Sequence, residues 1–112
     1  MNETEKYLFD VHGYIVIEGA LSSEELAAAN AAVDHYAAQI SIRNNDLAGL
    51  STTLVGKTGR GDLGGQLTWD KPYCDIFREM MVHPAFVPRL EAVLGTGFRL
   101  EGISGITMDE GS

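Results

Sequence analysis

The chain has 112 residues and a formal net charge of −8, from 16 acidic and 8 basic side chains. A chain this acidic is repelled by phosphate backbones and by anionic membrane surfaces, so neither nucleic acid nor a membrane is expected as a partner. The length corresponds to one domain or to part of one. The single cysteine, Cys74, excludes an internal disulfide and a cysteine-cluster metal site.

The N-terminus, Met-Asn-Glu-Thr-Glu-Lys, is acidic and lacks the apolar core of a signal peptide. No apolar run approaches the roughly 20 residues of a membrane span. We therefore expect a soluble, cytoplasmic protein. The composition leaves the oligomeric state open.

The first predicted elements are a short helix over 3–12 and a strand over 14–17. Tyr7 and Val11 have helical spacing, and Gly13 is a typical residue for ending a helix. The following Tyr-Ile-Val-Ile run is aromatic and β-branched, which predicts a strand buried on both faces.

A longer helix is predicted from Ser22 to about Ile40. Ser22 can cap the N3 amide while the Glu25 side chain reaches back to the Ser22 amide, and Leu21 and Leu26 form a hydrophobic staple. The expected apolar stripe consists of Leu26, Ala29, Val33, Tyr36, Ala37 and Ile40.

Residues 42–70 read as a glycine-rich loop, with glycines at 49, 56, 59, 61, 64 and 65. Short strands are possible at 50–55 and 67–69. A loop this long in a compact domain is usually functional or disordered.

Order returns at Pro72, which is predicted at the first position of a helix capped by Asp70. His83-Pro84 interrupts this helix, and a second one follows over 86–94 and ends at Gly95. Residues 98–108 predict a strand. Phe98, Leu100, Ile106 and Met108 lie on one face, and Arg99, Glu101, Thr107 and Asp109 lie on the other.

Several short patterns resemble functional motifs without meeting their requirements. Gly56-Lys57-Thr58 would need a glycine where Ser51 stands, and a helix directly after it, to bind phosphate. Arg60-Gly61-Asp62 is an adhesion tripeptide in other proteins, but we expect chance occurrence in a chain without a secretion signal. Cys74 lies among apolar residues at helical spacing, which favours packing over a nucleophilic role.

The three histidines, His12, His35 and His83, do not have the spacing of a metal site. Neither His-x-Asp nor His-x-Glu occurs in the chain. We assign no catalytic residue and no metal ligand.

Gln66, Thr68 and Trp69 are the candidates for a substrate pocket, because they follow directly after the glycine-rich segment. The competing interpretation is that Trp69 anchors this segment on the core.

Two groups of residues resemble the phytanoyl-CoA dioxygenase family of non-haem iron(II), 2-oxoglutarate-dependent oxygenases. The first is Phe9-x-x-x-Gly13-Tyr14-Ile15-Val16-Ile17, followed by Gly19-x-Leu21-Ser22-x-Glu24-Glu25-Leu26. The second is His83-Pro84 followed by Leu90-Glu91-x-x-Leu94-Gly95. The resemblance covers most of the chain outside residues 42–66.

The resemblance implies an α+β fold, with an N-terminal helical part and the first strands of a double-stranded β-helix, a cupin-like jelly roll. It also implies iron held by two histidines and one carboxylate, together with 2-oxoglutarate and a small-molecule or acyl substrate that is hydroxylated at a C–H bond. The family's ligands would lie beyond Ser112. We therefore expect residues 1–112 to be a single partial domain that is inactive alone and binds neither iron(II) nor 2-oxoglutarate tightly.

The alternative hypothesis is a complete, small, non-catalytic α+β module with a binding or structural role. It predicts a cooperative thermal transition for the isolated chain. A partial domain would instead expose strand edges over 98–108 and either associate or stay loosely packed.

Overall fold

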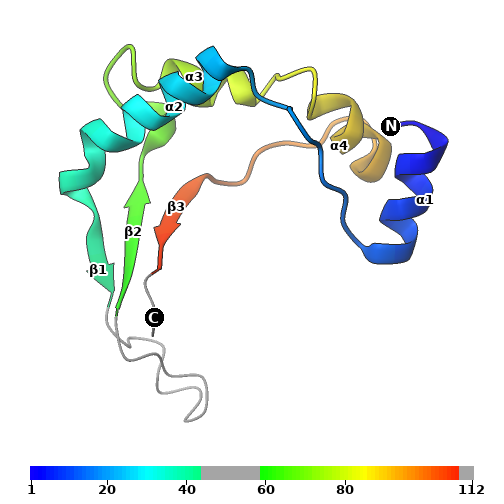
Figure 1. Cartoon of the computed structure of the whole chain (residues 1–112), viewed down its shortest axis with the longest axis horizontal. Helices are drawn as coiled ribbons and strands as arrows, with labels where there is room; N and C mark the ends of the chain where they lie inside the picture. Colours follow the sequence, from blue (N-terminus) through cyan, green and yellow to red (C-terminus); the bar gives the residue numbers. More distant parts are fainter. Residues whose placement is uncertain (44–58, 109–112) are drawn as a thin grey trace, which may run out of the picture.

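The computed structural model describes residues 1–43 and 59–108, and the fold over these residues is α+β (Figure 1). The elements in chain order are α1 (Glu3–His12), α2 (Ser23–Tyr36), the 3-10 helix η1 (Ala37–Gln39), β1 (Ser41–Arg43), β2 (Arg60–Gly64), the 3-10 helix η3 (Gln66–Thr68), α3 (Asp75–Met80), α4 (Val87–Leu94) and β3 (Ser104–Thr107).

The predicted first helix is confirmed as α1, and its ends follow from local chemistry. The Asn2 side chain accepts a hydrogen bond from the Glu5 amide at 2.8 Å, and the Glu5 carboxylate accepts one from the Asn2 amide at 3.3 Å. Gly13 ends the helix with a φ of 77°, in the left-handed region that favours glycine. The capping box therefore sets the start of the helix and Gly13 sets its end.

The strand predicted over 14–17 does not form among the described residues, and the prediction of burial on both faces is wrong. Tyr14 and Val16 are exposed, at 64% and 77%, whereas Ile15 and Ile17 are half-buried. The segment is irregular in structure, with alternating exposure. A β-branched sequence favours a strand only where a neighbouring strand accepts its backbone hydrogen bonds, and the described residues supply none here.

The second predicted helix is confirmed as α2, continued by η1, and Ser22 caps it. The Ser22 hydroxyl accepts a hydrogen bond from the Glu25 amide at 3.1 Å. The Glu25 carboxylate was predicted to accept a hydrogen bond from the Ser22 amide. It instead accepts one from the Ser22 hydroxyl and contacts His83.

The predicted apolar stripe of α2 is correct in part. Tyr36 is buried as predicted, and Ala29 and Ile40 are partly buried. Leu26 and Val33 are exposed, at 51% and 38%, and Ala32 is buried instead. The alanine-rich helix offers apolar side chains in more than one direction. The packing of α3 and of the core residues around Tyr36 selects the face that carries Ala32.

A three-stranded antiparallel sheet in the order β1-β2-β3 corrects the prediction of a glycine-rich loop over 42–70, because β2 lies within that range. β1 pairs with β2 in the register Ile42↔Gly61, and β2 pairs with β3 in the register Asp62↔Ile106. A side chain at position 61 would collide with Thr107 and Ile40, so glycine permits this close approach. The same glycines obscure the strand pattern in the sequence.

Of the two short strands considered in this region, 50–55 lies outside the described residues. Residues 67–69 do not form a strand, because η3 covers 66–68. Thr68 closes this turn with its amide and its hydroxyl, which both donate to the Gly65 carbonyl, at 2.8 and 3.0 Å.

The helix predicted to begin at Pro72 begins at Asp75 instead, as α3. A turn precedes it, in which the Lys71–Pro72 peptide is cis and the Tyr73 amide donates to the Asp70 carbonyl at 2.9 Å. The interruption at His83-Pro84 is confirmed, and α4 ends at Gly95 as expected. Of the strand predicted over 98–108, only β3 forms, because β2 offers partners for these four residues alone.

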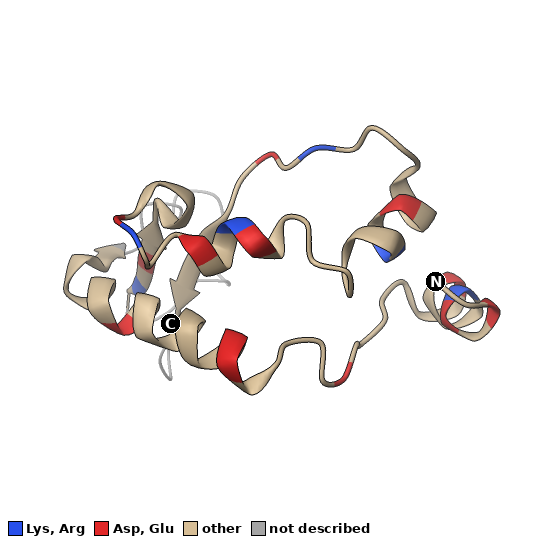
Figure 2. Cartoon of the chain, turned by 90° about the horizontal axis from the view of Figure 1, so that it is seen from above, with Lys and Arg blue, Asp and Glu red and all other residues tan. Residues whose placement is uncertain are grey.

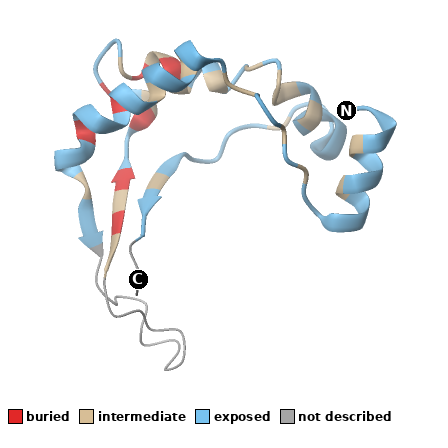
Figure 3. Cartoon of the chain, in the orientation of Figure 1, coloured by how far each residue is buried: buried red, intermediate tan, exposed pale blue. Residues whose placement is uncertain are grey.

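The main core lies in one half of an arch-shaped molecule (Figure 3). We call this half the sheet end: it contains α2, η1, the three strands, η3 and α3. Its buried cluster consists of Ala32, Tyr36, Leu63, Trp69 and Cys74. The burial of Cys74 agrees with its predicted packing role.

The other half, the helical end, contains α1, α4 and the irregular segments 13–20 and 95–103 (Figure 1). Neither α1 nor α4 has a buried residue. The chain exposes 8508 Å², whereas a compact monomer of its mass exposes about 6,000 Å². The radius of gyration is 17.1 Å, against about 13 Å for a compact domain of this length.

None of the helices in residues 1–43 and 59–108 has the length and apolar character needed to cross a membrane.

Candidate functional site

An apolar cavity of about 740 Å³ is a candidate site, and it lies where the helical end meets α3. The alternation that exposes Tyr14 and Val16 directs Ile15 and Ile17 toward it. From α4, Leu90 and Val93 line it at helical spacing. Further lining residues are Phe9, Phe77, Met80, Phe86 and Phe98. The lining is mostly apolar. Such a lining is typical of a core that lacks some of its packing side chains, or of a site that binds an apolar ligand.

Arg89 is the polar group best held at this cavity. Its Nη2 lies 2.6 Å from Oε1 of Glu5, and its Nη1 donates to the Ala85 carbonyl at 2.7 Å. The hydrogen bond from Arg89, together with its positive charge, lowers the pKa of Glu5 from its ordinary value. Arg89 Nε is buried and has no hydrogen-bond partner among the described residues. The ion pair joins α1 to α4 across the helical end.

A second polar group joins the two ends of the arch. The His83 Nδ1 accepts a hydrogen bond from the Ala85 amide at 3.0 Å, so the ring proton lies on Nε2. Nε2 then donates to Glu25 Oε2 at 2.8 Å, and Glu25 Oε1 accepts from the Ser22 hydroxyl at 3.2 Å. The His83 side chain is 12% exposed. We call this Glu25–His83 contact the clasp.

Ser22, Glu25 and His83 are the residue types of a hydrolytic triad, but the clasp connects them in the wrong order. In a triad the histidine lies between the nucleophile and the carboxylate, so that it can remove the hydroxyl proton. Here Glu25 lies between Ser22 and His83, and the Ala85 amide occupies the second ring nitrogen. The arrangement orients α2 against the α3–α4 junction and does not activate the serine.

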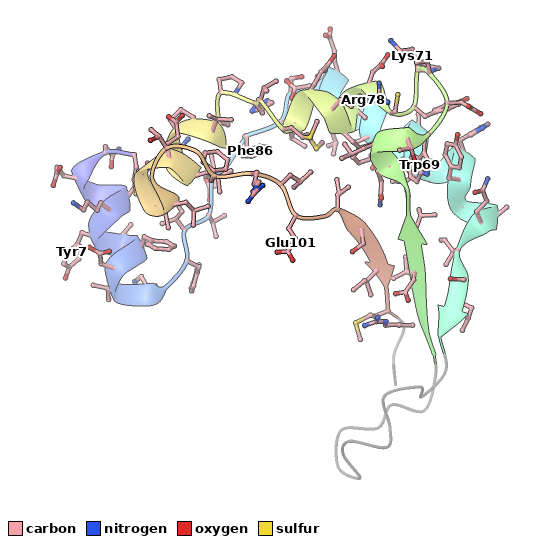
Figure 4. All side chains as sticks on the ribbon, turned by 180° about the vertical axis from the view of Figure 1, so that it is seen from behind. Tyr7, Trp69, Lys71, Arg78, Phe86 and Glu101 are labelled. Atoms are coloured by element: carbon pink, nitrogen blue, oxygen red, sulfur yellow. The ribbon has the colours of Figure 1, made fainter. Side chains whose placement is uncertain are left out.

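The predicted pocket residues Gln66, Thr68 and Trp69 lie at the sheet end, and none of them lines the cavity described above. Trp69 is 8% exposed, its ring stacks on Tyr36 at a centroid distance of 4.2 Å, and its Nε1 donates to the Gly64 carbonyl at 3.1 Å. Figure 4 shows it where β2 meets the helices. This geometry agrees with the anchoring interpretation of Trp69.

Gln66 is almost fully buried, at 4% exposure, and its Nε2 donates to the Leu63 carbonyl at 3.1 Å. Its Oε1 has no partner within the described part of the chain. Thr68 is held by its hydrogen bond to Gly65 and belongs to the same turn. The three side chains therefore share one turn, and Gln66 alone retains an unused polar atom there.

The described residues do not assemble a set of iron ligands. No group of three or more histidine, cysteine, aspartate or glutamate side chains converges within residues 1–43 and 59–108. The histidines have separate surroundings: His35 stacks on Tyr73 at 4.0 Å, His83 belongs to the clasp, and His12 lies beside Tyr14. These residues do not fit the iron site that the family resemblance implies.

No family model, no curated protein and no solved structure matches this chain.

Proposed function

We propose that the chain is the N-terminal part of an iron(II)- and 2-oxoglutarate-dependent oxygenase of the phytanoyl-CoA dioxygenase family. In this proposal the α+β structure comprises the outer helices and first strands of a double-stranded β-helix. The substrate is a small molecule or an acyl compound that is hydroxylated at a C–H bond.

The proposal depends on the order of elements that carry the resemblance. A glycine-terminated helix, an irregular apolar segment and a serine-capped helix occur as α1, 14–17 and α2. A glycine-terminated helix followed by a strand occurs again as α4 and β3. This succession agrees with the family signature except at 14–17, where the signature has a strand, and the rest of it supports the assignment.

The apolar surface of the helical end is a second source of support. Large apolar side chains remain exposed on several of its segments, including Val16 at 77%, Leu94 at 61% and Leu100 at 52%. Exposed apolar surface on this scale is typical of an interaction surface. In the proposed enzyme, further strands of the β-helix cover it, and 14–17 gains a strand partner.

In the proposed enzyme this chain would hold the helices in place and enclose the apolar cavity, but it would hold no metal. The iron and 2-oxoglutarate would supply the oxidising chemistry, and their ligands would come from outside the described residues. The clasp would hold α2 against the α3–α4 junction, and the Arg89–Glu5 ion pair would hold α1 against α4. The apolar cavity would become part of the interior or of a substrate pocket.

Two experiments test the proposal. Anaerobic calorimetric titration of the 112-residue chain with iron(II) and 2-oxoglutarate is expected to show no micromolar binding, and tight binding would contradict the division of roles. The coding sequence that follows Ser112 gives the positive test. A His-x-Asp or His-x-Glu there, with a second histidine further on, supports the proposal, and an open reading frame without them contradicts it.

The closed core of the sheet end favours one alternative, a complete small α+β binding or structural module without catalysis. Ala32, Tyr36, Leu63, Trp69 and Cys74 form a buried cluster that needs nothing from the helical end. This alternative predicts one cooperative thermal transition reported equally by the sheet-end core and the helical end. Separate transitions, or melting of α1 and α4 before the core, would favour the partial domain.

A further inference from the structure

His83 closes the turn from which α4 continues. Its carbonyl accepts hydrogen bonds from the amides of Phe86 and Val87, both at 3.0 Å. Its Nδ1 accepts a third hydrogen bond, from the Ala85 amide at 3.0 Å. Pro84 follows His83 directly, at the position where a helix tolerates proline. A side chain that accepts from the second or third amide is the mark of an N-cap, so His83 caps this turn in addition to its place in the clasp.

The cap requires the neutral form of the imidazole. A ring nitrogen accepts a hydrogen bond only while it carries no proton, and the second proton of an imidazolium would lie on Nδ1, facing the Ala85 N–H. An imidazolium would also place a positive charge at the N-terminal end of a helix, where the helix dipole favours negative charge. Imidazole takes up this proton within about pH 5–8. The stabilisation from the cap is therefore present above this range and is lost as the pH falls through it.

Glu25 acts in the opposite direction, because its carboxylate attracts the protonated ring. His83 Nε2 lies 2.8 Å from Glu25 Oε2, and in the described part of the chain no other carboxylate lies within ion-pair distance of this ring. Residues 80–88 contain no Lys, Arg, Asp or Glu, and Figure 2 shows this uncharged stretch between the charged residues of α3 and α4. The carboxylate that holds the ring therefore comes from α2.

The cations of the neighbouring helices are held by other partners. From α4, Arg89 Nη1 donates to the Ala85 carbonyl at 2.7 Å, and its charge is paired with Glu5 of α1. From α3, Arg78 Nε donates to the Leu67 carbonyl at 2.9 Å. The ring thus has one carboxylate partner and one amide partner, and only the carboxylate can stay bound to an imidazolium.

The turn that His83 caps forms part of the wall of the apolar cavity. Phe86 lines the cavity together with Arg89 and Leu90. The amide of Phe86 donates to the His83 carbonyl, and the two rings lie 4.8 Å apart between centroids. A change in the cap is therefore transmitted directly to the cavity wall.

We propose that His83 is a pH switch at the start of α4. In its neutral form the ring caps the turn and contacts Glu25, so one side chain joins α4 to α2. In acid the imidazolium keeps Glu25 and releases the Ala85 amide. The first turn of α4 and the cavity wall at Phe86 then loosen, while the contact with α2 remains. The proposal depends on the geometry of the clasp and is independent of the oxygenase assignment.

The test is a nuclear magnetic resonance titration of the ¹⁵N-labelled 112-residue chain between about pH 8 and pH 5. The ring ¹⁵N shifts should report the neutral Nε2–H tautomer of His83 at the upper end and the imidazolium at the lower end. The Ala85 amide shift should change over the same pH interval. The protection factor of this amide, which is corrected for the intrinsic effect of pH on exchange, should fall by roughly 2- to 30-fold, the factor that corresponds to the loss of an N-cap.

Three variants separate the two contacts of the ring. His83→Asn supplies a capping side chain that does not titrate, so the Ala85 amide should keep the same protection across the pH range. Glu25→Gln removes the charge that attracts the imidazolium and should move the loosening to more acidic pH. The matched control is His12→Asn, because the His12 imidazole is exposed and lies beside Tyr14, and it should leave the response of Ala85 unchanged.

The titration of the unmodified chain decides the proposal even if a variant fails to fold. Three results would overturn it. The first is an imidazolium at acidic pH with unchanged protection of the Ala85 amide. The second is a His83 ring that stays neutral to the acidic end of the titration. The third is a His83→Asn variant whose Ala85 amide loses protection in acid as much as that of the unmodified chain.

Discussion

The sheet end combines helices with the three described strands, whereas the helical end consists of α1, α4 and irregular segments, and the two ends are held together by different interactions. At the sheet end, stacked aromatic rings and buried apolar side chains close a core around Tyr36 and Trp69. At the helical end, the Glu5–Arg89 ion pair joins α1 to α4 beside an unfilled apolar cavity. Burial supplies most of the stability of a folded domain, so we expect the sheet end to be the more stable half.

The largest expected effect comes from removing the centre of the sheet-end core. Trp69→Ala deletes the ring that stacks on Tyr36 and contacts Phe77, and it should cost about 3–5 kcal/mol of unfolding free energy. The measurement is chemical denaturation followed by circular dichroism at a fixed chain concentration. The control is Tyr7→Ala, because Tyr7 is an aromatic residue of the helical end and is 67% exposed. If Trp69→Ala lowers the unfolding free energy no more than Tyr7→Ala does, the sheet end is not the more stable half.

Trp69→Phe separates the two contributions of this residue. It keeps an aromatic ring against Tyr36 but removes the indole N–H that donates to the Gly64 carbonyl. Its cost should be smaller than that of Trp69→Ala, because most of the apolar contact remains.

An intermediate effect is expected at the clasp, which joins the two ends. His83→Ala leaves the Ala85 amide and the Glu25 carboxylate without their imidazole partner, and it should cost about 1–3 kcal/mol. Thermal denaturation measures the loss, and hydrogen exchange should show it in the amides between α3 and α4. The control is His12→Ala, whose imidazole is exposed and should matter little. Equal effects of the two substitutions would show that the clasp contributes no stability.

The smallest effect is expected at the Glu5–Arg89 ion pair, and it depends on pH. Arg89 lowers the pKa of Glu5 below its ordinary value of 4.5, so the folded state prefers the charged carboxylate. The resulting stabilisation is present above 4.5 and is lost as the pH falls through the lowered folded-state pKa.

Comparison of unfolding free energies at neutral and acidic pH measures this contribution. Glu5→Gln should reduce stability at neutral pH and remove part of the acid dependence. Glu3→Gln, on the same helical turn, should preserve both the stability at neutral pH and its dependence on acid. If the stability of Glu5→Gln falls with acid as much as that of the unmodified chain, the ion pair is not the source of the acid dependence.

The regions also differ in how well the sequence predicts them. Both ends of α1, the start of α2, the interruption at His83-Pro84 and the end of α4 at Gly95 were correctly predicted. Each depends on capping groups or backbone preferences within a few residues in the sequence. The strand predicted over 14–17 failed because a strand needs a partner, and sequence periodicity cannot supply one.

The candidate sites follow the same division. Gln66, Thr68 and Trp69 were selected because of their place after a glycine-rich segment, and the structure gathers them in one turn at the sheet end. The clasp was not foreseen, since its two side chains are 58 residues apart. The cavity residues were recognised as apolar, but the sequence does not say which apolar faces meet and which remain uncovered.

The sequence by itself determined the local features of this protein: its acidity, its capped and glycine-terminated helices, and the resemblance on which the proposed function depends. Only the tertiary structure decided that the glycine-containing residues 60–64 form β2, that α2 buries Ala32 and leaves Leu26 exposed, and that β2 pairs with both β1 and β3. The physical reason is the range of the interactions. Caps and turns are closed by neighbours within one helical turn, whereas strand pairing and burial depend on residues distant in the chain.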